Sequence, residues 1–506
     1  MSEESPCCTG SEAPPTSSEA PPTGVEPLIV EQEISDGQKK VKIAVVGCSH
    51  GEMDLIYDVM SLIEKEKGYK FDLLICCGDY QSVRNHGDLL QMSVPPCYRS
   101  LQTFYKYYSG EKTAPVLTLF IGGNHEASGY LSELPNGGWV APNIYYMGFA
   151  NCIRFAGLRI AGLSGIYAHF DAQFSHFERP PFADKEIKSA YHTRNVDVFR
   201  LRQLKAQQDD KLSNPIDIMF SHDWPCGIPD FGDKEWLWRK KDRFEADHNS
   251  GKLGNPSGMK LIYDCRPRYY LAAHLHIAFK ALVPHKGSGT QRPAPTKFLS
   301  LDKPIPGRHF MQTLEINVPA DAKLELSYDP QWLAVLKSTD KLTIADKERI
   351  ILPDMAGNQP CVYTDRKDFR PTEEEMEEIG KLGDLTIKKD TFRMTAPPLK
   401  QVTTASKNVP PSAYYRNPQS AEFCQWLGIR DLNQLLVEQN TEHVGVPYYM
   451  MPDDEIQNQD DVDFGEDDFV IDGAGAAVSS QEAEQSSEPE AKKFRSTAEQ
   501  NEGELK

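Results

Sequence analysis

The stretch Val41-Lys42-Ile43-Ala44-Val45-Val46-Gly47-Cys48-Ser49-His50 decides the fold. It is a short run of β-prone residues that ends at a glycine and is followed by a cysteine and a histidine. Such a run is typical of a central strand in a sheet covered on both faces. The turn after such a strand is where α/β proteins place functional groups. Taken alone, the Cys48–His50 pair fits either a reactive site or a buried thiol beside a structural histidine.

An apolar run that ends at glycine and is followed by a polar side chain recurs twice in the next 80 residues. Residues 53–67 carry apolar side chains at helical spacing and are followed by Gly68, which predicts an amphipathic helix. The apolar run 71–77 then ends at Gly78-Asp79, and the run 115–121 ends at Gly122-Gly123-Asn124-His125-Glu126. The succession predicts a βαβ unit with a parallel sheet, in which each strand delivers a metal-binding side chain at its end.

Two later apolar runs end in histidines. Residues 215–220 lead to His222, and residues 269–273 lead to His274 and His276. Because the last two histidines are separated by one residue in a segment that we expect to be extended, they should point to the same face.

The groups at the strand ends form one chemical set. They are Cys48, His50, Asp79, Asn124, His125, His222, His274 and His276. This set is too large for one tetrahedral zinc and suits two divalent cations that share a carboxylate, for which Asp79 is the natural bridge. Two cations that share one carboxylate lie close enough together to hold both the attacking and the leaving oxygens of a phosphoryl displacement.

The charge is concentrated at the two ends of the chain. Residues 1–40 carry two basic and eight acidic side chains, and residues 452–506 carry four basic and 17 acidic ones. These ends account for the whole net charge of −19, so the charge does not exclude a nucleic-acid substrate for the neutral middle. Both ends are poor in apolar residues, and we expect them to be disordered.

Scattered cysteines and the absence of a long apolar run indicate a soluble protein of a reducing compartment, cytoplasmic or nuclear. The basic cluster 492–495 has two interpretations, a nuclear import signal or a short basic patch in a solvated tail.

The ordered set of strand-end residues resembles that of the calcineurin-like metallophosphoesterases. The resemblance implies an α/β (α+β) fold, a β-sandwich flanked by helices. Further segments resemble the RNA lariat debranching enzymes, namely residues 78–85, 107–111, 121–128, 137–146, 163–167, 221–225, 273–276 and 296–303. We therefore expect a disordered arm at 1–40, a metallophosphoesterase catalytic domain at 41–285, a C-terminal lariat-debranching domain at 286–446 and an acidic disordered tail at 447–506.

The resemblance implies a role for each residue of the set. One metal position would be surrounded by Cys48, His50, Asp79 and His276, and the other by Asp79, Asn124, His222 and His274. His125 would be the general acid, with Asp79 and Asn124 as its catalytic neighbours. The cofactors would be two divalent ions, Fe²⁺, Zn²⁺ or Mn²⁺. Cys48 departs from the aspartate usual in the superfamily, and its soft thiolate favours Zn²⁺ or Fe²⁺ over Mg²⁺.

The implied reaction is hydrolysis of the 2′-5′ phosphodiester bond at the branch point of excised intron lariats, in the nucleus, with shuttling to the cytoplasm left open. Branched intron RNA would be the partner, and neither DNA nor a membrane is expected. Two alternatives remain: a metallophosphoesterase acting on other phosphoesters, and a scaffold that has lost catalysis.

Three residues are candidates for substrate contact, each with an alternative. Arg84 suits an RNA phosphate or a salt bridge to Asp88 or Glu52. Tyr167 begins an aromatic segment, residues 165–182, that fits a substrate-recognition loop or a packed surface loop. Glu126 suits a substrate contact or the orientation of neighbouring metal ligands.

Overall fold

The computed structural model describes residues 36–205, 215–286, 293–354, 361, 363–399, 411–439 and 444–451. The chain divides into two units, Met1–Met451 and Pro452–Lys506, and all described residues belong to the first. The predicted N-terminal arm and acidic tail therefore fall almost entirely outside the described residues, and so does the basic cluster 492–495.

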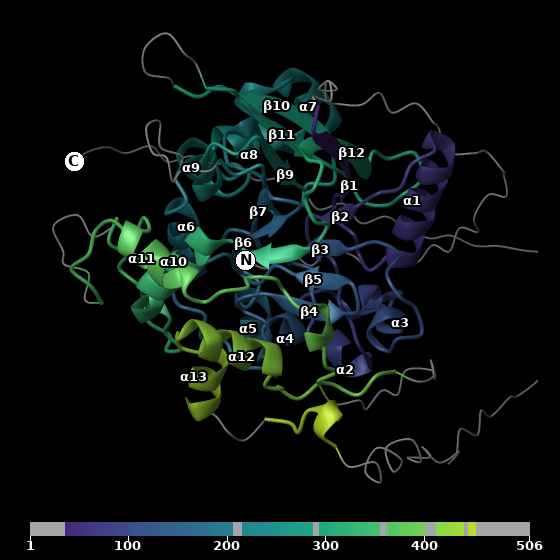
Figure 1. The fold of residues 1–506 in the computed structure, drawn as a ribbon. Coiled ribbons are helices and arrows are strands. Elements are labelled where there is room, and N and C mark those ends of the chain that lie inside the picture. Colours follow the sequence, from purple (N-terminus) through teal and green to yellow (C-terminus); the bar gives the residue numbers. More distant parts are fainter. Residues whose placement is uncertain are drawn as a thin grey trace, which may run out of the picture. The chain divides into compact units, whose positions relative to one another are not determined.

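The described part of the chain contains both helices and strands (Figure 1). The strands are β1 (Gln38–Val46), β2 (Leu73–Cys76), β3 (Thr118–Phe120), β4 (Gly138–Ala141), β5 (Ile144–Tyr146), β6 (Ala150–Phe155), β7 (Leu158–Leu163), β8 (Ile218–Ser221), β9 (Tyr269–Ala272), β10 (Phe279–Val283), β11 (Thr296–Ser300), β12 (Met311–Pro319) and β13 (Leu326–Tyr328). The α-helices are α1 (Met53–Lys67), α2 (His86–Leu89), α3 (Phe104–Tyr108), α4 (Ser128–Leu131), α5 (Asp184–Ser189), α6 (Asn195–Arg202), α7 (Lys234–Lys240), α8 (Arg243–Asn249), α9 (Pro256–Cys265), α10 (Pro330–Ser338), α11 (Glu373–Gly380), α12 (Pro418–Leu427) and α13 (Leu432–Gln439). The 3₁₀ helices are η1 (Pro96–Tyr98), η2 (Asp171–Gln173), η3 (Ile228–Phe231), η4 (Asp340–Leu342), η5 (Lys389–Thr391) and η6 (Tyr448–Met450).

The strands form two mixed sheets. One has the order β12-β1-β2-β3-β5-β4, with β1, β2, β3 and β5 parallel. The other has the order β10-β11-β9-β8-β7-β6-β13, with β11, β9, β8 and β7 parallel. The βαβ unit predicted from the first two apolar runs is confirmed: α1 connects β1 to β2 and ends at Gly68 in the left-handed conformation.

The two sheets pack face to face, and helices cover the outer faces. On β1, Ile43 and Val45 join the core between the sheets, whereas Ala44 and Val46 pack on the other face with Met53 and other residues of α1. Since β1 is buried on both faces, its sequence is a continuous apolar run rather than an alternating one. The expected β-sandwich flanked by helices is confirmed.

The strand register brings the functional turns together. Val46 pairs with Cys76, and Cys76 pairs with Phe120, so β1, β2 and β3 end side by side. In the second sheet, β8 and β9 are also parallel neighbours, with Phe220 opposite Leu271. Parallel strands end at the same edge of a sheet, and all five of these strands are followed by candidate metal ligands.

The C-terminal half of the chain completes both sheets. β12 pairs with β1 along its whole length, from Gln38 opposite Pro319 to Val46 opposite Met311. β11 lies between β10 and β9 in the second sheet. The predicted boundary at 285/286 falls between β10 and β11, two paired strands, and remains a prediction.

Two details at the ends differ from the sequence-based limits. β1 begins at Gln38, before the predicted start at residue 41, because residues 38–40 pair with the end of β12. Residues Tyr448–Met450, placed in the predicted tail, form a 3₁₀ turn. Among the described helices, none is long and apolar enough to cross a membrane.

Candidate metal centre

Four side chains from three turns converge on one point. The ligating atoms of Cys48, His50, Asp79 and His276 all lie within 4.8 Å of one another. These residues follow β1, β2 and β9. The Nε2 atoms of His50 and His276 are only 3.1 Å apart. The structure thus brings together the first of the two ligand sets that the resemblance implied.

Both histidines of this group are held in the neutral form that binds metals. Burial, opposed by Asp79 and assisted by His125 and Lys303, lowers the pKa of His50 to about 4. Burial and the neighbouring His50 lower the pKa of His276 to about 3. A neutral imidazole offers a lone pair, so two such nitrogens facing each other suit a cation between them.

Cys48 contributes a soft donor. The side chain is completely buried, and its Sγ accepts a hydrogen bond from the backbone N–H of His274 at 3.2 Å. Burial, together with the charge of Asp79, raises the pKa of the Cys48 thiol well above its usual value. A thiolate at this position therefore needs a cation to compensate its charge, which is the condition under which cysteine ligates metals.

The second set gathers around His222. The Nε2 atom of His222 lies 3.2 Å from Oδ1 of Asn124 and 3.2 Å from Oδ1 of Asp79. The Nδ1 atom of His222 lies 2.8 Å from the carbonyl oxygen of Cys77, to which it donates, so Nε2 is the nitrogen that faces Asn124 and Asp79. The ring of His274 lies beside that of His222, with centroids 5.0 Å apart.

Asp79 lies between the two groups. Its Oδ2 atom is 3.8 Å from Nε2 of His50, and its Oδ1 atom accepts a hydrogen bond from the backbone N–H of His125 at 2.8 Å. Burial acts to raise the pKa of Asp79, but His222, His50 and His125 outweigh it and hold the pKa well below the usual range. An ionised carboxylate with one oxygen toward each group fits a bridging ligand.

Backbone strain is concentrated at these ligands. His50, Asp79, His274 and His276 have φ values of 46°, 48°, 63° and 48°, in the left-handed region that few residues other than glycine adopt. Strained backbone of this kind persists where the surrounding structure imposes it, and it clusters at functional sites. A Cβ atom at Gly123 would collide with Asp79 and His222, so the close approach of these turns requires glycine there.

The expectation that His274 and His276 lie on an extended segment is wrong. β9 ends at Ala272, and both histidines lie in the turn that follows, with left-handed backbone. As a result they do not share one face in the manner of a strand: His276 joins His50, and His274 lies beside His222.

His125 lies at the edge of the first group. Its ring centroid is 5.3 Å from that of His50, and the side chain is partly exposed. An accessible imidazole beside the candidate ligands can exchange a proton with a bound substrate.

Glu126 forms hydrogen bonds with both the turn after β2 and the turn after β3. Its carboxylate accepts backbone hydrogen bonds from Tyr80 at 2.7 Å, from Gln81 at 2.9 Å and from Gly123 at 2.9 Å. Only 1% of the residue is exposed, and burial with the nearby charge of Asp79 raises its pKa to about 8. This position fits the second interpretation of Glu126, orientation of the ligands, rather than contact with RNA.

Gln81 is a residue that the sequence analysis missed. Its side-chain amide lies 3.3 Å from Nδ1 of His50, on the ring nitrogen that does not face His276, and orients the ring. The only available signal was its place two residues after Asp79, because glutamine itself carries no specific chemistry.

Arg84 lies in a buried ion cluster. Its guanidinium donates to Asp88 at 2.8 and 3.0 Å, to Glu133 at 2.8 Å and to Thr395 at 2.9 Å. The plane of the guanidinium lies over the ring of Tyr130, 3.9 Å from its centroid. With 1% of the residue exposed, the arrangement favours the second interpretation of Arg84, a salt bridge to Asp88.

We expect Arg84→Ala to lower the free energy of unfolding by about 3–5 kcal/mol, because the change leaves the buried carboxylates of Asp88 and Glu133 without the cation that compensates their charge. Chemical denaturation would measure the loss, with Arg239→Ala, an exposed position on α7, as the control. Normal stability combined with a raised KM for RNA would instead support a phosphate contact by Arg84.

Tyr167 lies on the loop beside the second group of ligands. Its backbone N–H donates to Asp223 at 3.1 Å, and Asp223 directly follows His222. The hydroxyl lies 3.2 Å from Nδ1 of His169, and the side chain is partly exposed. Its contact with substrate remains a prediction.

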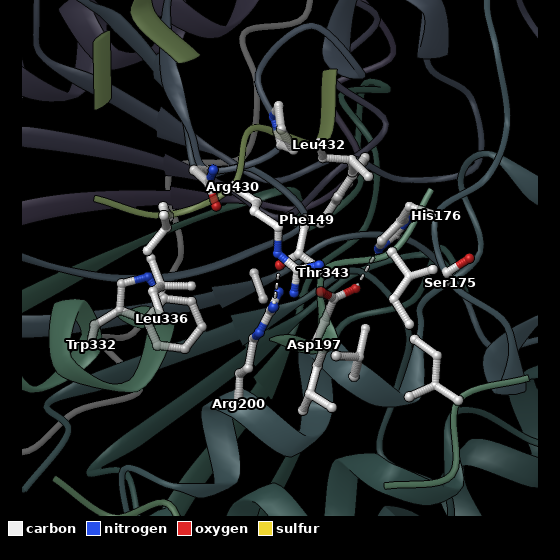
Figure 2. A pocket seen from close by; sticks show the side chains of 18 residues that line it. Phe149, Ser175, His176, Asp197, Arg200, Trp332, Leu336, Thr343, Arg430 and Leu432 are labelled. Atoms are coloured by element: carbon white, nitrogen blue, oxygen red, sulfur yellow. Dashed lines mark hydrogen bonds and ion pairs between the residues drawn. The ribbon is translucent and has the colours of Figure 1, made fainter. Parts of the chain in front are cut away.

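A separate cavity of about 40 Å³ lies between α6, α10 and the start of α13 (Figure 2). Figure 2 shows His176 directed at Asp197, a 2.7 Å contact, and Arg200 reaching Thr343 at 2.8 Å. None of the candidate metal ligands lines this cavity. It has room for a few water molecules and cannot admit a branched nucleotide.

Comparison with known proteins gives consistent matches along the chain. The family model described as calcineurin-like phosphoesterase matches residues 41–278, and the one described as lariat debranching enzyme, C-terminal domain, matches residues 293–432. The chain is 73% identical to the lariat debranching enzyme of Caenorhabditis elegans over 97% of this chain and 96% of that protein. It is 74% identical to the Caenorhabditis briggsae enzyme, over 97% and 95%, and 44% identical to the human enzyme, over 87% and 78%.

Proposed function

The chain belongs to the lariat debranching enzymes, and from this membership we infer that it hydrolyses the 2′-5′ phosphodiester bond at the branch point of excised intron lariats. The products are linear RNA with a 5′ phosphate and a free 2′ hydroxyl on the branch nucleotide. The observation that best supports this function is the 73% identity to a lariat debranching enzyme over nearly the whole chain. The activity belongs to RNA processing, in which linear introns are passed on for turnover.

The donor atoms support divalent metals as cofactors, and we propose two ions. Cys48, His50, Asp79 and His276 would hold one, and Asp79, Asn124, His222 and His274 the other. When bound, two cations would activate a water molecule and neutralise the charge that develops on the phosphate oxygens. The neutral nitrogens of His50 and His276 and the ionised carboxylate of Asp79 are in the protonation states that such binding requires.

We propose His125 as the general acid. An alkoxide at the 2′ position is a poor leaving group, and a proton delivered to that oxygen as its bond to phosphorus breaks lowers the barrier. His125 is partly exposed, and its backbone N–H is fixed by Asp79, so the ring is held beside the ligands while it remains accessible to substrate.

For the identity of the metals we propose Zn²⁺, Fe²⁺ or Mn²⁺, with Cys48 as the residue that selects softer ions over Mg²⁺. Replacing Cys48 by serine is expected to weaken zinc binding about 10- to 100-fold, because the hydroxyl does not supply an anionic sulfur. Metal titration monitored by metal analysis of the dialysed protein would measure the change. Cys97→Ser, which alters an exposed cysteine, is the control. Unchanged zinc affinity together with an unchanged debranching rate would contradict a ligand role for Cys48.

We propose that the protein acts in the nucleus, where excised introns arise, with the basic cluster 492–495 as a candidate import signal. DNA lacks the 2′ oxygen and cannot present the branch, so RNA is the expected nucleic-acid partner. Localisation of the full chain, with and without alanine at the three basic positions of this cluster, would test the proposal.

The activity itself is tested with purified protein, added Mn²⁺, Fe²⁺ or Zn²⁺, a branched RNA and a linear RNA of the same sequence with only 3′-5′ bonds. We expect the branched RNA to be opened and the linear RNA to remain intact. Cleavage of both RNAs at similar rates would indicate a general phosphoesterase, and cleavage of neither would contradict the proposed function.

A further inference from the structure

A basic loop, residues 302–309, lies against the turn that carries Cys48 and His50. The loop connects β11, in one sheet, to β12, in the other. The backbone N–H of Asp302 donates to the carbonyl oxygen of His309 at 3.0 Å and closes the loop. The backbone N–H of Gly47 donates to the carbonyl oxygen of Phe310 at 3.1 Å, and a Cβ atom at Gly47 would collide with the backbone of Asp302. The loop is therefore held in place directly above the end of β1.

Lys303 is the cation of this loop that has no carboxylate partner. The carboxylate of Asp302 accepts the backbone N–H of Lys303 at 2.8 Å and the guanidinium of Arg308 at 3.1 Å. Within the part of the chain that the structure describes, no acidic oxygen lies within ion-pair distance of the Lys303 ammonium group. The side chain is partly exposed, so its charge is available to a ligand from solvent.

The loop that carries Lys303 also lies against the end of β9. The backbone N–H of Leu301, the residue before the loop, donates to the carbonyl oxygen of Ala272 at 3.2 Å, and Ala272 is the last residue of β9 before the turn of His274 and His276. Together with the contacts at Gly47, this places the loop of Lys303 on the side of the site that is formed by His50 and His276. His125 lies on the same side, with its ring centroid 5.3 Å from that of His50.

The branch nucleotide carries two phosphates on neighbouring oxygens of one ribose. The phosphate on the 2′ oxygen is cut, and the one on the 3′ oxygen is not. If His125 protonates the 2′ oxygen, the branch ribose lies beside His125 and His50. The uncut 3′ phosphate then lies close to the same histidines, where Lys303 supplies an unpaired positive charge.

We propose that Lys303 binds the uncut 3′ phosphate of the branch nucleotide and thereby distinguishes a branch from a linear 2′-5′ bond. The inference rests on the proposed function and deepens it, because it names the feature of the substrate that is recognised. A linear RNA with a single 2′-5′ bond and a free 3′ hydroxyl lacks this phosphate. Lysine binds phosphate as a point charge, so arginine at the same position should retain most of the contact.

The test compares wild type, Lys303→Met and Lys303→Arg on two substrates. One is a branched RNA, and the other has the same 2′-5′ bond with a free 3′ hydroxyl. We expect Lys303→Met to lower kcat/KM for the branched RNA about 10- to 100-fold, and to leave kcat/KM for the linear 2′-5′ RNA unchanged. The slope of log KM against log salt for the branched RNA should fall by about 0.7, the value for one lost phosphate contact on a single strand. Lys303→Arg should lie close to wild type.

Lys323→Met is the matched control, since Lys323 is an exposed lysine in the turn at the opposite end of β12. Metal content and thermal stability, measured on each variant, should stay at the wild-type values. An equal loss on both substrates, or no loss on either, would overturn the inference. If wild type cuts neither substrate, the proposed function itself fails, and that result is distinct from a failure of the Lys303 contact.

Discussion

Asp79→Asn is expected to lower the debranching rate by about three orders of magnitude and to release metal from the protein. The change keeps the size of the side chain but removes the negative charge and one of the two oxygens that face His50 and His222. Stabilisation by bound cations amounts to several kcal/mol of the barrier, and about 1.4 kcal/mol corresponds to a factor of ten in rate. Single-turnover rates on branched RNA and metal analysis of the dialysed protein would measure both effects.

Asp58→Asn is the control for this change, because Asp58 is an exposed acid on α1. The backbone around residue 79 is strained, and Asn tolerates left-handed φ values as Asp does, so the fold should persist. A variant that keeps both its metal and a rate within tenfold of wild type would show that Asp79 does not bridge the two groups of ligands.

His125→Asn is expected to lower the rate on branched RNA by about 10²- to 10⁴-fold while metal binding is retained. The side chain lies beside the proposed ligands and supplies a proton rather than a metal bond. The loss should be much smaller on bis(p-nitrophenyl) phosphate, whose leaving group needs no proton. Rates on the two substrates, together with pH profiles for wild type and variant, would measure the difference.

His248→Asn, which changes a histidine paired with Asp230 at 3.3 Å away from the ligand set, is the matched control. An equal loss on both phosphodiesters would mean that His125 orients the site or binds metal instead of donating a proton to the 2′ oxygen.

The local parts of the fold were predictable from sequence. β1, α1 and β2 follow from apolar runs, a helical spacing and the glycine that ends the helix, each of which is a pattern within one short stretch of sequence. The sequence also predicted that each strand ends at a candidate ligand. Neighbouring parallel strands end at the same edge of a sheet, which brings together the side chains that follow β1, β2 and β3, whereas those that follow β8 and β9 belong to the second sheet. The resemblance to a family then assigned the ligands to two groups. In the structure Cys48, His50, Asp79 and His276 lie together, and His222 lies beside Asn124.

The parts that were not predictable depend on contacts between distant segments. The partners of Arg84 include Glu133 and Thr395, and no local pattern points to either. The pairing of β12 with β1 joins residues 311–319 to residues 38–46, which lie far apart in the sequence. The left-handed turn at His274 and His276 was misread as extended because an apolar strand precedes it and the residues are not glycine.

The position of Lys303 also depends on contacts between distant segments. Lys303 ends the segment 296–303, which resembles the family, but nothing in the sequence indicated that this segment lies beside the turn of Cys48 and His50. Only the packing of the loop 302–309 on Gly47 brings it there. Specificity groups supplied by a later segment of the chain are therefore harder to find from sequence than ligands that follow strands.

The most direct test of the account is debranching of a branched RNA in water enriched in ¹⁸O, followed by mass analysis of the products. We predict one ¹⁸O atom in the 5′ phosphate of the linear product and an unlabelled 2′ hydroxyl on the branch nucleotide. This pattern means that water attacks phosphorus and that the bond from phosphorus to the 2′ oxygen breaks. Label on the 2′ hydroxyl, or a branch that remains intact with metal supplied, would contradict the account.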